Sequence, residues 1–436
     1  SFVMAMDGKE LVEKLAKLSQ VQSIKDIPQL THALFPGTHC PLMGAAMAVG
    51  GIKDSLIVVV GTDECTYYTK SMTIHSEKFG GIGGRCVSVV LDDHDVTFGS
   101  AEKVQEAFKE IIEEYRPQCV FLVTTCVIEI IGDDFDAISE GLSELYGIPV
   151  LPVHTEHFKC EDHLPGLERT ITVCAEMMKP CNCDNSVNLL GQRMGDFATT
   201  ELYAMLQKAG VKIGLQLPCG CSVDDIKNAA AAKVNIVVND IALPLAQKMQ
   251  EKFGIPYVYF NKFVIPEKIY EAYKNLFGYL ELELPEELEG LYQNAREEIE
   301  KTKGELEGIT YIYGNTPYAV FEMNCFLSSL GMVPQVIQTN RYTEADEPYA
   351  KEILQYTDPY VCKAANIAPL QYVYDVLSPY LYLGHEFGNR LRQKGIAIVH
   401  SDRASGMLGF EVTGYLLQQL VKSVREAKEY RKELGL

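Results

Sequence analysis

The chain has 436 residues, with 39 Lys and Arg against 59 Asp and Glu, which gives a formal net charge of −20. With 47% hydrophobic and 22% charged residues, a chain of this length can bury a full core, which excludes a disordered acidic tail protein. The negative charge argues against nucleic acid as the main partner, because phosphates require a basic surface. The sequence has no run of about 18 apolar residues, so we expect no membrane partner and a cytoplasmic protein.

Predicted strands and helices alternate along the chain. Residues 1–18 are predicted to form a charged amphipathic helix and not a signal peptide. After it, short apolar runs typical of buried parallel strands alternate with segments whose apolar residues recur at helical spacing. The predicted strands are 56–60, 119–123, 149–153, 187–190, 212–217, 235–238, 310–313, 333–337, 360–362, 381–384 and 396–400. The predicted helices that follow residue 18 are 100–115, 135–145, 199–209, 223–230, 285–306, 319–330 and 410 onward.

Two interruptions divide this pattern into units: a segment rich in Cys and Asn at 179–186, and the long charged helix at 285–306. The pattern indicates an α/β fold of three doubly wound, Rossmann-like domains with parallel sheets. We predict these boundaries: an N-terminal helical segment 1–26, a cluster-bearing α/β domain 27–182, a second α/β domain 183–306 that includes the long helix, and a third α/β domain 307–436. In such sheets, ligands collect at the loops that follow the carboxyl ends of strands.

Thirteen cysteines are unusual for a chain with these features. In a large α/β protein, thiolates more often bind metal or do redox work than form disulfides, and an odd number cannot pair up internally. The sequence has no CxxC, CxxCH or HExxH motif, so thioredoxin-like, c-type haem and zincin sites lack their usual signals.

Three cysteines of the first predicted domain lie in loops. Cys65 follows the strand 56–60, Cys126 follows the strand 119–123, and Cys40 lies in an earlier loop. A single cysteine is more often simply buried, but three in the loops of one domain favour a functional site. Soft sulfur donors suit iron–sulfur clusters and zinc, and the spacing alone leaves the metal open.

Several segments carry a resemblance to a known family. Residues 124–134 (TTCVIEIIGDD) resemble the signature of the nitrogenase component 1 superfamily, most closely that of β-type molybdenum–iron protein subunits and related cofactor-assembly scaffold subunits. Further similar segments are 40–46 (CPLMGAA), 61–65 (GTDEC), 154–158 (HTEHF) and 186–190 (SVNLL). In order, they extend the resemblance roughly from residue 27 to residue 421.

The resemblance implies an oxidoreductase subunit. Cys40, Cys65 and Cys126 would bind a [4Fe–4S] or a larger [8Fe–7S] cluster at an interface with a component 1-like subunit, in a homo- or hetero-oligomer. A nitrogenase iron-protein-like ATPase would supply low-potential electrons, which the cluster would pass to a reductive active site. The chain lacks a GxxxxGK[ST] phosphate loop, which suits a protein that does not hydrolyse ATP itself.

The sequence also departs from the family pattern. Glu64 stands where the second motif usually has glycine. Asn239 stands where cofactor-bearing α-type subunits have a cysteine after a strand, and Leu408 where they have the cofactor histidine. A standard iron–molybdenum cofactor site is therefore not expected here: either the chain is the non-catalytic partner of a heteromer, or its pocket binds something else.

Three other cysteines are weaker candidates for metal ligands. Cys160 is a candidate fourth ligand of the interface cluster. Cys219 and Cys221 form a CxC pair after a predicted strand and, with the CxC pair at 181–183, are candidates for a structural zinc or a second metallocluster. The simpler interpretation is that the two pairs never meet.

Three further functions stay open from the sequence. The chain could be a scaffold subunit for assembly of a complex metallocluster, or a reductase of a tetrapyrrole or a sulfur-containing small molecule. It could also be a ligand-binding α/β protein with zinc-bound or buried cysteines.

Overall fold

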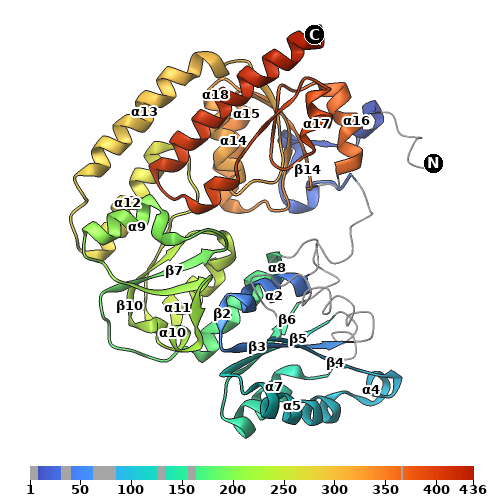
Figure 1. Ribbon diagram of the computed structural model, residues 1–436, viewed down its shortest axis with the longest axis vertical. Coiled ribbons are helices and arrows are strands. Elements are labelled where there is room, and N and C mark those ends of the chain that lie inside the picture. Colours follow the sequence, from blue (N-terminus) through green and yellow to red (C-terminus); the bar gives the residue numbers. More distant parts are fainter. Residues whose placement is uncertain (1–7, 31–40, 62–84, 126–132, 156–163, 365–366) are drawn as a thin grey trace.

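The computed structural model describes residues 8–30, 41–61, 85–125, 133–155, 164–364 and 367–436. Within these ranges the chain forms three larger sheets, each covered by helices, and one two-stranded sheet (Figure 1). Cys40, Cys65, Cys126 and Cys160 lie outside the described residues.

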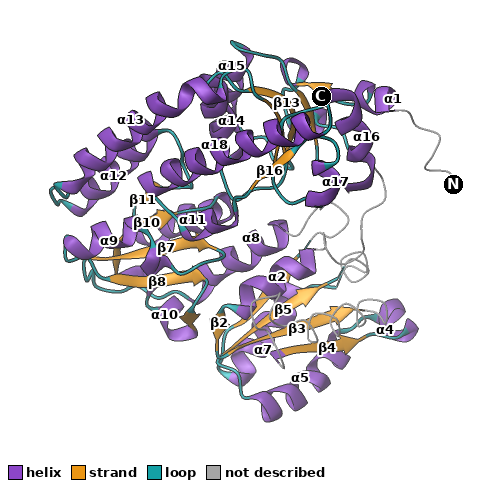
Figure 2. Cartoon of the chain, turned by 45° about the horizontal axis from the view of Figure 1, so that its top comes forward, coloured by secondary structure: helices purple, strands orange, loops and turns teal. Residues whose placement is uncertain are grey.

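The first sheet has four parallel strands, in the order β4 (Cys86–Val90), β3 (Ser55–Gly61), β5 (Cys119–Thr124) and β6 (Val150–His154). Residues of β3 and β5 are buried on both faces, as expected for central parallel strands. One face packs on α5 (Ala101–Tyr115) and α7 (Phe135–Tyr146). The other face packs on α2 (Pro41–Gly50) and α8 (Leu164–Val173), which lie side by side towards the centre of the molecule (Figures 1 and 2).

The second sheet is also parallel, with the order β11 (Tyr257–Tyr259), β10 (Ala232–Val237), β7 (Ser186–Gln192) and β8 (Ile213–Pro218). Its helices are α9 (Glu201–Lys208), α10 (Val223–Lys227), α11 (Leu243–Phe253) and α12 (Pro266–Leu280). The apolar cluster that contains α2 and α8 also includes Leu245 and Met249 of α11, so the first two sheets share a core. A short parallel pair, β2 (Ile52–Lys53) with β9 (Cys221–Ser222), joins them as well.

The third sheet has six strands, in the order β1 (Ala16–Lys17), β14 (Tyr360–Cys362), β13 (Val333–Gln338), β12 (Thr310–Tyr313), β15 (Leu381–Leu383) and β16 (Ala397–Val399). All pairs are parallel except β1 with β14. The surrounding helices are α14 (Val320–Ser329), α15 (Glu347–Leu354), α16 (Ile367–Leu377), α17 (Gly388–Arg392) and α18 (Phe410–Glu433). The long helix α13 (Glu287–Leu306) packs along α18 (Figure 1).

The predicted α/β fold with parallel, doubly wound sheets is confirmed, with differences at the edges. The sequence pattern missed β4 and β11, which are both edge strands and less buried than the central ones. In its described part, the predicted helix at 1–18 is present only as α1 (Gly8–Glu13), and the prediction is wrong at Ala16 and Lys17, which pair with β14. That pairing satisfies backbone groups at a sheet edge through a contact over 340 residues away in the chain, which local periodicity does not encode.

In doubly wound sheets, ligands bind where the strand order reverses, outside the carboxyl ends of the strands. This point falls between β3 and β5 in the first sheet, between β7 and β10 in the second, and between β12 and β15 in the third. Across the described ranges, no helix is long and apolar enough to cross a membrane.

Candidate functional site

The reversal point of the first sheet lies between the two strands that precede Cys65 and Cys126 in the sequence. The last described residues here are tightly held. The backbone N–H and the Oγ1 of Thr125 each donate to the carbonyl oxygen of Val60 at 3.2 Å. The Oγ1 of Thr155 donates to the carbonyl oxygen of Thr124 at 3.0 Å. The ends of β3, β5 and β6 are therefore tied together where the sequence predicts the cluster.

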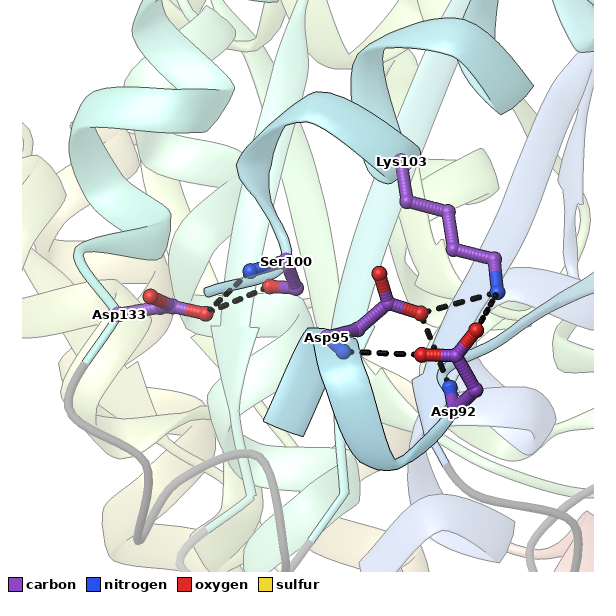
Figure 3. A network of polar contacts seen from close by, with 5 residues as sticks. All are labelled: Asp92, Asp95, Ser100, Lys103 and Asp133. Carbon is purple, nitrogen blue, oxygen red and sulfur yellow. Dashed lines mark hydrogen bonds and ion pairs between the residues drawn. The ribbon is translucent and has the colours of Figure 1, made fainter. Parts of the chain in front are cut away.

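The motif 124–134 re-enters the described part of the chain at Asp133. One carboxylate oxygen of Asp133 accepts hydrogen bonds from the backbone N–H (3.0 Å) and the hydroxyl (2.6 Å) of Ser100, just before α5 (Figure 3). Asp134 caps α7 by accepting a hydrogen bond from the Ala137 N–H at 3.0 Å. Ser100 makes no side-chain cap of α5, because its hydroxyl binds Asp133 instead. The two motif aspartates thus fasten this end of the motif to two helices.

A second polar group lies close by, at α4 (Asp93–Phe98), and caps that helix (Figure 3). Asp92 and Asp95 each accept a hydrogen bond from the other's backbone N–H at 2.9 Å. Lys103 Nζ lies 2.9 Å from Asp95, and the Asp92 backbone and Lys103 together lower the pKa of the Asp95 carboxyl. These partners explain the acidic residues as a structural cap.

Among the described residues, no group of three or more His, Cys, Asp or Glu side chains could hold an ion, so the two CxC pairs are not brought together in such a group. Cys221 is buried in the shared core, and burial raises the pKa of its thiol to about 12. Burial also raises the pKa of Cys219. Cys183 is exposed, and the Cys181 thiol donates to its near neighbour, the Lys179 carbonyl, at 3.3 Å. Metal ligation requires thiolates, which burial disfavours at Cys219 and Cys221.

A cavity of about 230 Å³ lies between the second and third sheets. The loops after β7, β10, β11, β12, β13 and β14 all contribute to its lining, together with Leu164 of α8. The carboxyl edges of the two sheets therefore face the same space, as the doubly wound fold predicts for a ligand site. A larger cavity of about 760 Å³ adjoins it, and the two share Asp240, Tyr259, Ala319, Arg341 and Asp346.

Carboxamides dominate the polar lining of the smaller cavity. They are Asn239, Asn261, Asn315, Gln338 and Asn340. Among the described residues that line it, there is no cysteine and no histidine. The Asn239 side chain accepts a hydrogen bond from the Ile241 N–H at 3.1 Å and so caps a 3₁₀ turn. Leu408 is fully buried in the core of the second domain and does not line the cavity.

The charged groups of this cavity are held by neighbours. The hydroxyl of Tyr259 donates to Asp240 and accepts from the side chain of Asn261 at 2.7 Å. Arg341, in the loop after β13, donates to Glu168 of α8 at 3.0 Å. Burial, and to a smaller extent Asp240, raise the pKa of Asp346. The cluster ligands that the family implies are soft thiolates or imidazoles, so the described lining does not fit a protein-ligated metallocluster.

Sequence reasoning singled out Asn239 of this lining and missed the others. The signal was available, because each carboxamide follows or ends a strand of a doubly wound sheet. What the sequence could not supply is that two separate sheets point these ends at one cavity.

Comparisons with known proteins agree with the motifs. The family described as nitrogenase component 1 type oxidoreductase matches residues 40–425. The nitrogenase iron-molybdenum cofactor biosynthesis protein NifE of Clostridium pasteurianum is 31% identical over 50% of this chain and 49% of its own length. NifE of Rippkaea orientalis is 25% identical over 72% of this chain and 69% of its own length. The nitrogenase molybdenum-iron protein alpha chain of Methanosarcina barkeri is 25% identical over 72% of this chain and 62% of its own length.

The chain spans about half the length of the first of these relatives. Among solved structures, "Nitrogenase Cp1 at pH 6.5" superimposes with a TM-score of 0.75 over 92% of this chain and 94% of that chain, at 15% identity. This likeness shows the fold.

Proposed function

Because the chain belongs to the nitrogenase component 1 type oxidoreductases, we propose that it is a scaffold subunit in a complex that assembles a metallocluster. The observation that carries this proposal is the similarity to NifE proteins, which reaches 72% of the chain. Those relatives are named for biosynthesis of the iron-molybdenum cofactor. The described cavity lining supports the proposal, since it offers no thiolate or imidazole to hold a finished cofactor for turnover.

In this proposal, Cys40, Cys65 and Cys126 hold a [4Fe–4S] or [8Fe–7S] cluster at an interface with a component 1-like partner subunit. A cluster bound there supplies one-electron chemistry. The described residues contribute the frame: Thr125 holds the end of β5 against β3, and Asp133 fastens the far end of the motif to Ser100. An iron-protein-like ATPase is the proposed electron donor.

A second candidate is a reductase subunit that passes electrons to a substrate, including a tetrapyrrole or a sulfur-containing small molecule. The similarity to the molybdenum-iron protein alpha chain of Methanosarcina barkeri favours it. The scaffold and the reductase share the interface cluster and differ in what leaves the complex. A scaffold releases a metallocluster to an acceptor protein, whereas a reductase releases a reduced product and keeps its metal.

The interface cluster is tested by iron and acid-labile sulfide on anaerobically purified protein, with EPR after reduction. We expect roughly two or more irons per chain, lost in Cys126→Ala and retained in Cys183→Ala. Cys183 is the matched control because it is an exposed cysteine outside the motif. Wild-type protein without iron, or with zinc alone, would refute the cluster.

The scaffold role is tested by incubating the iron-loaded complex with an acceptor protein that lacks its metallocluster. Iron that moves to the acceptor and activates it is the expected result. If the metal instead stays in place while electrons from the iron-protein-like ATPase are consumed in turnover, the chain is a reductase subunit.

A further inference from the structure

The smaller cavity between the second and third sheets is built for hydrogen bonds. Each carboxamide offers an N–H donor and a carbonyl acceptor, and Thr316 and Thr339 add hydroxyls that can do either. Asn315 follows β12 and is exposed to this space. Such a lining matches a ligand that both donates and accepts hydrogen bonds at several positions.

The charges of the described lining balance. Two arginines, Arg193 and Arg341, and two aspartates, Asp240 and Asp346, line the cavity, so the formal charge is 2 − 2 = 0. Arg341 is also paired with Glu168 at 3.0 Å. A sulfide cluster or an oxyanion in a partly desolvated cavity requires unmatched positive charge or direct ligands. The described lining therefore favours an uncharged ligand.

A second, independent observation is that the buried Tyr318 hydroxyl lacks a hydrogen-bond partner among the described residues. Tyr318 is among the residues that line the cavity, and it is only 5% exposed. Burial raises the pKa of Tyr318 well above its ordinary value, so the group stays a neutral hydroxyl. A buried polar group without a partner is costly, which a bound ligand or water would relieve.

We infer that this cavity binds a small uncharged organic molecule rich in hydroxyl or amide groups and does not ligate a metallocluster. The volume of about 230 Å³ lies below the range of about 300–1,000 Å³ for drug-sized ligands, so the molecule is small. The inference goes beyond the proposed scaffold role, because it assigns the assembled metallocluster to the partner subunit or the interface and not to this cavity.

Ligand binding is tested with the neutral probes myo-inositol and malonamide and the anionic probes molybdate and sulfate. We expect saturable binding of at least one neutral probe to the full-length chain, by calorimetry, and none of the anions. Asn315→Leu keeps the side-chain size and removes its polar groups, and Tyr318→Phe removes the hydroxyl. Each should weaken neutral-probe binding about two- to tenfold, the range of one or two hydrogen bonds. Asn294→Leu, on an exposed position of α13, is the control and should bind as the wild type does.

The metal part is tested by anaerobic reconstitution of a full-length variant with Cys40, Cys65 and Cys126 all changed to Ala. We expect no bound iron above background, with the wild-type circular dichroism spectrum as the check on folding. If this variant misfolds, the single Asn315→Leu variant decides, since an iron content below that of the wild type would place metal in the cavity. Iron retained by the triple variant, anion binding that Asn315→Leu abolishes, or no neutral-probe binding would each overturn the inference. If the proposed interface cluster is absent, the result is different, because the wild-type protein itself then contains no iron.

Discussion

Glu201, just inside α9, is a carboxylate held by a distant part of the chain. It accepts hydrogen bonds from the backbone N–H groups of Phe410 (2.8 Å) and Glu411 (3.2 Å), and from the hydroxyl of Tyr273 at 2.7 Å. Burial raises its pKa to about 7, and these hydrogen bonds only partly offset the effect. Gly409 has a positive φ of 104°, and a Cβ there would lie 1.9 Å from the Glu201 carboxylate, so the contact requires glycine. Glu201 is thus a titratable side chain that connects α9 to the N-terminus of α18.

The raised pKa of Glu201 predicts a pH-dependent stability. Between pH 4.5, the ordinary pKa of this group, and about pH 7, Glu201 is protonated in the folded state and ionised in the unfolded state. The stability that comes from this bound proton is therefore fully present below pH 4.5 and is lost as the pH rises through about 7. Glu201→Gln keeps one oxygen acceptor and removes the titration. We expect the variant to gain about 1–2 kcal/mol over the wild type between pH 5.5 and 8.

The measurement is urea unfolding of wild type and Glu201→Gln at several pH values. Glu297→Gln, at an exposed position of α13, should follow the wild-type curve. If the free energy of unfolding depends on pH in the same way for wild type and Glu201→Gln, Glu201 does not titrate in this range.

The N-terminus of α12 is bound by a carboxylate from α14, a helix of the third sheet. Glu322 of α14 is fully buried and accepts hydrogen bonds from the N–H groups of Val264 (3.0 Å) and Ile265 (2.8 Å), directly before α12. The hydroxyl of Thr413 in α18 donates to the Val264 carbonyl at 2.6 Å. A helix N-terminus leaves unpaired N–H groups that a carboxylate satisfies well. Three elements are therefore joined through one short segment.

Removing the Glu322 carboxylate should destabilise this junction. Glu322→Ala leaves two buried N–H groups without an acceptor, and we expect a loss of about 2–4 kcal/mol in the free energy of unfolding. Glu322→Gln retains one acceptor oxygen and should lose less. Amide hydrogen exchange at Val264 and Ile265 reports the effect locally. Glu344→Ala, at an exposed position, is the control, and equal exchange in the Ala and control variants would contradict the capping role.

Helix α8 lies centrally, among the three larger sheets and their helices (Figure 2). Its apolar face packs in the core shared by the first two sheets, and its Glu168 binds Arg341 of the third domain at 3.0 Å. Both side chains are about one-third exposed (29% and 33%). The pair also borders the larger cavity. It is the polar link between α8 and the loop after β13.

Removing the ion pair between Arg341 and Glu168 should make α8 less firmly held against the loop after β13, with little loss in the free energy of unfolding. For Arg341→Met we expect a change of under about 1 kcal/mol in unfolding, because part-exposed pairs contribute little. Hydrogen exchange in α8 should rise, whereas exchange in β3 and β12 should not. Arg296→Met removes an exposed contact to Glu267 at 3.9 Å and should leave α8 unchanged. Unchanged exchange in α8 for Arg341→Met would mean that apolar packing alone holds the helix.

Much of the fold is readable from the sequence. Central strands such as β3 and β5 are continuous apolar runs, and helices such as α5 and α7 show apolar residues at helical spacing. The apolar edge strands β4 and β11 are short and mostly only partly buried, and the sequence pattern missed both. For the candidate site, the strands before Cys65 and Cys126 are neighbours in the sheet, whereas ligation by those cysteines stays a prediction.

The fold class, the family motifs and the strand-end positions where functional groups collect can be predicted from the sequence, because each depends on residues close together in the chain. Which strand ends share a cavity, where β1 pairs, and that Glu201 meets Phe410, 209 residues further along, become known only from the folded chain. Such contacts form when whole sheets and helices bury their apolar faces against one another. Their partners are set by that packing, which no local pattern of residues records.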